Sequence, residues 1–156
     1  MMMNQLKSMK PQVTKAVVGG LVGTVVMTLM MYFVAPKMTG RTMDIASELG
    51  QMMGGSWAAG MAAHFFNGVV IFPAIYVFVL FQYLPGAPLL RGAIWGVLLW
   101  LAAQMVLMPM IGNGFFSSNL GPPSAVASLV SHLVYGGILG SMTGSPTSPP
   151  QSPSTR

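Results

Sequence analysis

The stretch VTKAVVGGLVGTVVMTLMMYFVA, residues 13–35, decides what kind of protein this chain is. It is almost wholly apolar, and at ~1.5 Å per residue a helix of this length crosses the ~30 Å hydrocarbon layer of a membrane. Three further runs have the same character, at 57–83, 90–111 and 124–142. Because nothing inside a bilayer satisfies exposed backbone, each run is predicted to be helical. The sequence predicts an all-α integral membrane protein with four transmembrane helices, over residues 13–144.

The charged residues are few and unevenly placed. Of the 156 residues, 53% are hydrophobic and 6% are charged, against about 25% charged in soluble domains. One side of the predicted bundle holds both termini and the loop near 85–91, with five of the basic residues: Lys7, Lys10, Lys15, Arg91 and Arg156. The other side holds Lys37 and Arg41. Since basic residues favour the cytoplasmic side, we expect the cell (inner) membrane with both termini cytoplasmic.

The ends of the chain are expected to be peripheral to the bundle. Residues 1–12 form a basic cytoplasmic segment, and the run after it exceeds the ~7–15 apolar residues of a secretory signal, so it is interpreted as a retained anchor. The Pro/Ser-rich tail, 145–156, has no apolar face and is expected to be disordered. The net charge of +5 suits anionic membrane lipids. No nucleic-acid partner is expected.

Internal similarity suggests two related halves. Gly19, Gly23 and Pro36, which is expected to end the first helix, recur 73 residues later. Ser56, His64 and Gly68 recur 68 residues later, as Ser124, His132 and Gly136. Parallel repeats of this kind occur in membrane proteins. The pattern predicts two helical hairpins related by a pseudo-twofold axis along the membrane normal.

Small residues recur at helical spacing in all four runs. They let helix backbones approach closely. The glycines predicted to mediate this packing are Gly19, Gly23, Gly60, Gly68, Gly92, Gly96, Gly136 and Gly140.

The two histidines, His64 and His132, each lie four residues before a glycine, inside an apolar run. An imidazole in hydrocarbon needs a partner, so both are predicted to face the bundle or a neighbouring subunit. One hypothesis is a hydrogen bond across a helix seam. The alternative is that His64 and His132 bind a haem or a chlorin, since a glycine one turn away leaves room for a flat macrocycle.

The first outer loop contains a second predicted element. Residues 42–54 are amphipathic, with Ile45, Leu49, Met52 and Met53 on one face, which indicates a short interfacial helix with Thr42 as a plausible N-cap. Asp44 and Glu48 lie on its polar face, on the same membrane side as both histidines. Two imidazoles and two carboxylates suit Zn²⁺ or Fe²⁺. Because no metal-binding spacing accompanies them and Lys37 and Arg41 balance their charge, no metal site is predicted.

Several motifs together resemble a known family. They are GGLVGTVVMTLMMYFVAPKM, MDIASELGQMMGG, LPGAPLLRG, MPMIGNGFF and SHLVYGGILG, in this order between residues 15 and 144. In these the chain is similar to a family of small four-helix prokaryotic membrane proteins of unknown function. The resemblance implies four transmembrane helices and carries no activity or site residue.

Three functions stay open on the sequence alone. No arrangement of nucleophile and base and no phosphate-binding loop is present, so an enzyme is not expected. A non-catalytic accessory or structural subunit, packed against partner membrane proteins or against copies of itself, agrees best with the glycine-lined helices. The alternatives are a subunit that binds haem or chlorin, and a small oligomeric transporter or channel.

Overall fold

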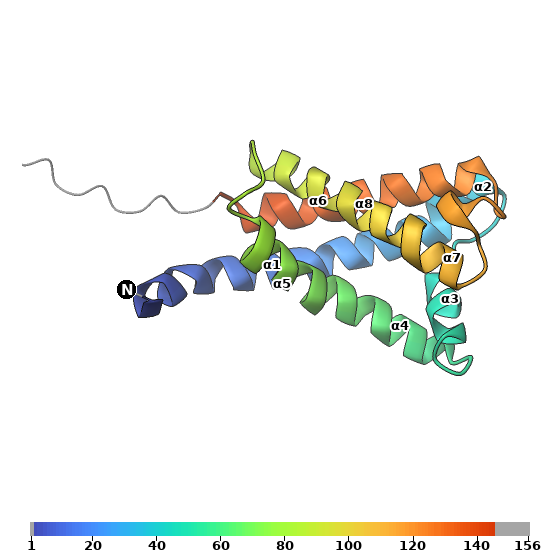
Figure 1. The fold of residues 1–156 in the computed structure, drawn as a ribbon, viewed down its shortest axis with the longest axis horizontal. Helices are drawn as coiled ribbons and strands as arrows, with labels where there is room; N and C mark the ends of the chain where they lie inside the picture. The colour runs from blue at the N-terminus through green and yellow to red at the C-terminus, as the bar shows by residue number, and fades with distance from the viewer. Residues whose placement is uncertain (1, 146–156) are drawn as a thin grey trace, which may run out of the picture.

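The computed structural model describes residues 2–145, with side chains from Gln12 onward (Figure 1). Of the predicted Pro/Ser-rich tail, the structure describes Ser145 alone. Of the predicted basic segment, the side chains before Gln12 also lie outside the described part. Within residues 2–145 all regular structure is helical. The all-α prediction is confirmed.

Four helical stretches are long and apolar enough to span a membrane: Gln12–Thr39, Trp57–Leu80, Pro88–Met110 and Pro122–Thr143, called spans 1 to 4 below. Their limits lie within a few residues of the predicted runs. Span 1 contains most of α1 (Met2–Leu29), the π-helical turn η1 (Met30–Val34) and α2 (Ala35–Thr39). Span 2 comprises α4 (Trp57–Phe66), η2 (Asn67–Ile71), α5 (Phe72–Ile75) and η3 (Tyr76–Leu80). Span 3 comprises α6 (Pro88–Ala102), η4 (Ala103–Leu107) and α7 (Met108–Met110), and span 4 is α8 (Pro122–Thr143).

Wide turns accommodate the prolines at 36, 73 and 109. Each follows a five-residue π-helical turn, and the residue before it donates its N–H to the carbonyl five residues earlier. Proline has no N–H, and its ring clashes with the carbonyl four residues before it, so an extra residue in the turn relieves both problems. The expectation that Pro36 ends the first helix is wrong, because α2 continues to Thr39.

The spans pack unequally around span 4. Spans 1 and 3 both lie along α8, whereas span 2 packs on span 1 through η2 and α5 and diverges from the bundle toward α4 (Figure 1). The buried aromatic residues Tyr76, Trp95 and Tyr135 form the core near the end where the span 2–span 3 loop lies. The bundle is therefore tight at one end and open at the other.

The pseudo-twofold repeat stays a prediction. The π-helical turns η1 and η4 do begin 73 residues apart, but a twofold axis would make the span 1–span 4 and span 2–span 3 interfaces equivalent. Among the described residues, the first has close backbone packing and the second has nothing comparable.

The helix predicted within residues 42–54 is present as α3 (Ile45–Gln51), shorter than the predicted segment. Its N-cap is Asp44, not Thr42, and the Asp44 carboxylate accepts the Ser47 N–H at 3.1 Å. The buried residues of α3 are Ala46 and Gly50, which pack against the backbone at the start of α4. The reason is that two helix backbones in contact leave room only for the smallest side chains.

Candidate functional site

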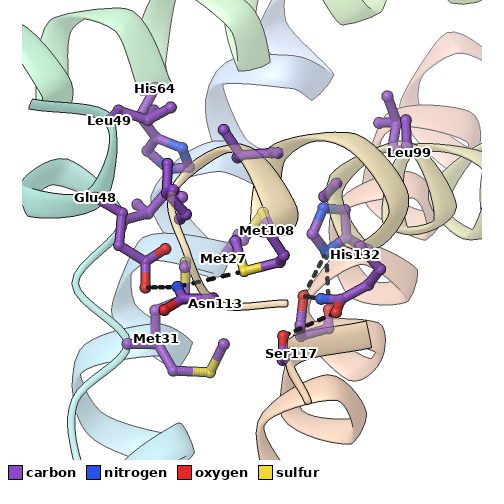
Figure 2. Close-up of a pocket in the computed structure, with 18 of the residues that line it drawn as sticks. Met27, Met31, Glu48, Leu49, His64, Leu99, Met108, Asn113, Ser117 and His132 are labelled. Carbon is purple, nitrogen blue, oxygen red and sulfur yellow. Dashed lines mark hydrogen bonds between the residues drawn. The ribbon is translucent and has the colours of Figure 1, made fainter. Parts of the chain in front are cut away.

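A cavity of about 620 Å³ lies between the four spans and α3 (Figure 2). It occupies the open end of the bundle, where span 2 diverges. Its wall is mainly apolar and rich in methionine, with Met27 and Met31 from span 1 and Leu99 and Met108 from span 3. Cavities of this size and character are typical small-molecule sites.

The cavity opens sideways as well as toward the loops that join span 1 to span 2 and span 3 to span 4. Met52, Val106 and Met110 line it and are 48%, 57% and 64% exposed, respectively. These residues come from the end of α3 and from the outer part of span 3. These three side chains are therefore both part of the cavity wall and part of the protein surface.

Both histidines line this cavity, from opposite sides in Figure 2. His64 is buried on α4, and its Nε2 lies 3.0 Å from the Thr28 hydroxyl. That hydroxyl donates its hydrogen to the Thr24 carbonyl at 2.7 Å. Since a hydroxyl has one hydrogen, the contact requires His64 Nε2–H to be the donor. A neutral His64 therefore carries its lone pair on Nδ1.

His132 is held in the opposite tautomer. Its Nδ1 lies 2.8 Å from the Ser128 carbonyl oxygen, one turn earlier in α8. A carbonyl only accepts hydrogen bonds, so Nδ1 carries the hydrogen and Nε2 the lone pair. A backbone partner of this kind also fixes the orientation of a ligand histidine. The His132 ring is thus locked by its own helix.

Most other polar groups in the inner part of the cavity are already paired. Gln104 donates to the Ser128 hydroxyl and accepts from the Ser117 hydroxyl. The Tyr135 hydroxyl donates to the Gly68 carbonyl at 2.7 Å. Asn67 lines the cavity and has no side-chain partner within the described part of the chain. Asn67 and the two imidazoles are therefore the groups left to contact a ligand.

The cavity mouth near α3 carries the charged residues. Glu48 and Arg41 line it, and burial raises the pKa of Glu48, although Arg41 opposes the shift. The Asn113 amide donates to Glu48 at 3.4 Å and approaches the Met108 sulfur at 3.7 Å. Asn113 thereby links the acid at the mouth to the methionine that lies between the two histidines in Figure 2.

Asp44 is a structural residue. Its carboxylate accepts hydrogen bonds from the Tyr32 hydroxyl at 2.6 Å, the Ser47 hydroxyl at 2.7 Å and the Trp57 indole at 3.2 Å. Burial alone would raise the pKa of Asp44, but these bonds outweigh it and the pKa lies below its ordinary value. Asp44 joins spans 1 and 2 to α3, and among the described residues no three His, Asp or Glu side chains form a group able to hold a metal.

The predicted packing glycines all lie at close approaches inside the chain. A Cβ on any of them would press on a neighbouring segment. Gly19 and Gly23 face span 4, Gly68 faces Thr24 of span 1, and Gly60 faces Ala46 of α3. The span 3–span 4 interface contains the remaining four: Gly92, Gly96, Gly136 and Gly140. Because these contacts are internal, the glycine stripes by themselves do not indicate an external partner.

The chain belongs to a family of unknown function, DUF6789, whose model matches residues 10–154. This confirms the resemblance found in the sequence motifs. Comparisons with curated proteins and with solved structures gave no match. The site must therefore be interpreted from its own chemistry.

Proposed function

We propose that this chain is a small, non-catalytic membrane protein that holds an apolar ligand in the cavity between its spans. The observation that carries the proposal is the cavity itself, about 620 Å³ in volume, apolar in its wall and lined by both histidines. A sideways opening at Met52, Val106 and Met110 gives the ligand a route from the bilayer. The basic residues favour placing the cavity in the outer half of the inner membrane, with both termini cytoplasmic.

Filling the cavity tests this proposal. Ala103, on the π-helical turn η4, lines the cavity, and Ala103→Phe would occupy part of the space. Ala62 is exposed on α4 and does not line the cavity, so Ala62→Phe adds the same side chain on the lipid side. Native mass spectrometry of protein purified from its own membranes should show a bound mass in the wild type and in Ala62→Phe. That mass should be lost or depleted in Ala103→Phe, with thermal unfolding confirming that both variants are folded. A wild-type protein with no bound mass would count against the proposal.

A haem or chlorin is one occupant that this proposal includes. Both histidines line the cavity, each with one ring nitrogen that has no partner among the described residues, and a backbone-anchored imidazole such as His132 suits an axial ligand. An absorption spectrum of the purified protein tests it directly. A Soret or chlorin band that disappears in His132→Ala would support a macrocycle, and a spectrum with protein absorption alone would exclude it as the resident ligand.

Packing against a partner subunit, or against a second copy, is the other proposed role. Its support is a shallow apolar groove on the lipid-facing side of spans 3 and 4, where Gly137 and Ser141 lie one turn apart between larger side chains such as Leu89 and Val130. A partner helix could approach closely at such small residues. Cysteine cross-linking at Ser141 in native membranes should then yield a defined adduct, whereas a lone monomer in mild detergent would contradict this role.

A further inference from the structure

The two cavity histidines offer hydrogen-bond acceptors and no free donor. His64 Nε2–H is used by the Thr28 hydroxyl, and His132 Nδ1–H by the Ser128 carbonyl. In each neutral ring only the other nitrogen remains, and that nitrogen carries a lone pair. No described residue donates a hydrogen bond to either lone pair.

The apolar wall favours these neutral forms. A charged imidazole within hydrocarbon is costly unless a counter-ion accompanies it. Of the acidic residues, only Glu48 lines the cavity, and it lies at the mouth where Asn113 contacts it. Arg41, the basic residue in the lining, binds the Leu120 carbonyl and the Ser124 hydroxyl. Of the nearby polar groups, Thr28 and Gln104 already have partners. Asn67, which lines the cavity and has no side-chain partner in the described part of the chain, carries both donors and an acceptor and so favours neither form of a ligand by itself.

We propose, resting on the ligand-binding function above, that the cavity selects an apolar ring with two hydrogen-bond donors, namely a quinol in preference to its oxidised quinone. A quinol carries hydroxyl groups on opposite edges of a flat ring, and the two histidines line the cavity on opposite sides. A quinone carries two acceptors instead, which would face two lone pairs. The lipid-soluble tail of such a molecule suits the opening at Val106 and Met110.

Met108 is the side chain that the ring would displace. It lines the cavity between the two histidines in Figure 2, is buried, and its sulfur lies 3.7 Å from the Asn113 amide nitrogen. An unbranched methionine changes rotamer at low cost and adapts to flat ligands. The space between the acceptors is therefore adjustable.

The test compares three probes of nearly equal shape, with protein reconstituted in lipid nanodiscs. They are decyl-ubiquinol, decyl-ubiquinone, and the dimethyl ether of the quinol, which has no donor hydrogens. Since one hydrogen bond is worth up to roughly tenfold in affinity, the quinol should bind about tenfold or more tightly than the other two. His132→Phe and His64→Phe should each reduce that preference, while Ala62→Phe should retain it.

A second measurement does not depend on any ligand. Nitrogen-15 NMR of histidine-labelled protein should report the Nε2–H tautomer for one ring and the Nδ1–H tautomer for the other, and Thr28→Val should alter only the first. Equal binding of quinol and quinone, or two identical tautomers, would overturn this inference and leave the ligand-binding proposal intact. Absence of any bound molecule, native or added, would instead overturn the ligand-binding proposal itself.

Discussion

Replacing Gly136 by alanine should weaken the interface between spans 3 and 4, although Gly137, its neighbour, should tolerate the same change. A Cβ on Gly136 would overlap the Gly92 carbonyl and lie 2.8 Å from the Gly96 nitrogen and 2.9 Å from the Gly96 Cα. All three neighbours are backbone atoms, which cannot rotate away. A Cβ on Gly137 would lie 3.1 Å from Leu89 Cδ1, the end of a flexible side chain. The two variants therefore share a chemical change and differ only in what the new methyl group meets.

The expected magnitude follows from these contacts. Carbon atoms attract at ~3.5–4.0 Å, so Gly136→Ala must push the two helices apart by roughly 1 Å. Overpacking of this kind costs about 1–3 kcal/mol, while both variants share the helix-propensity gain of ~1 kcal/mol of alanine over glycine. We expect Gly136→Ala to be about 2 kcal/mol less stable than Gly137→Ala, which is on the order of 30-fold in the ratio of folded to unfolded protein.

The assay is reversible unfolding in mixed micelles of mild detergent and increasing SDS, followed by circular dichroism and tryptophan fluorescence. Trp95 lies in the buried core and Trp100 on the same helix, so fluorescence reports on this interface. Gly137→Ala should unfold at nearly the wild-type SDS fraction and Gly136→Ala at a clearly lower one. If the two variants unfold at the same SDS fraction, spans 3 and 4 do not approach each other closely at Gly136.

Three further predictions concern Asp44, Met108 and the membrane topology. Asp44→Asn should lower the free energy of unfolding by about 1 kcal/mol at neutral pH, because the N-cap and interspan bonds weaken. The folded pKa of Asp44 lies below its ordinary value near 3.8. The stability difference between wild type and Asp44→Asn should therefore persist above pH 5 and disappear as the pH falls through the folded pKa. Thermal melts at several pH values measure this, and a stability difference independent of pH would refute it. Met108→Ala should enlarge the cavity and strengthen binding of decyl-ubiquinol, measured by calorimetry, whereas weaker binding would show that Met108 contacts the ring. In right-side-out vesicles, a membrane-impermeant maleimide should label Ser118→Cys and leave Ala87→Cys unlabelled, and the reverse pattern would invert the proposed topology.

The interior prolines mark the points after which the sequence pattern no longer predicts the direction in which each helix face points. Each π-helical turn adds a residue, and one residue rotates the following helix face by ~100°. A helix face that is predicted from a regular 3.6-residue period therefore points in the wrong direction after residues 34, 71 and 107. Met108 follows one of these turns, and Asn113 lies in an outer loop, so no periodic signal placed either residue beside the cavity. The amphipathic pattern predicts Glu48 on the polar face of its helix, and only the structure shows that it lines the cavity.

The apolar runs by themselves determined the four spans and the all-helical class, because a bilayer accepts no other backbone arrangement for them. Glycine spacing likewise indicated where helices would touch, since that depends on side-chain size alone. The local sequence did not determine which partner each polar group would find. Gly136 and Gly137 are chemically identical, and His64 and His132 share the same local pattern, yet one glycine contacts a backbone and the other a leucine side chain. The two imidazoles likewise settled into opposite tautomers because Thr28 lies on another span and Ser128 on the same one. Ser128 is local to His132, but the neighbours of His64, Gly136 and Gly137 lie far away in the chain, and only the tertiary structure brings them together.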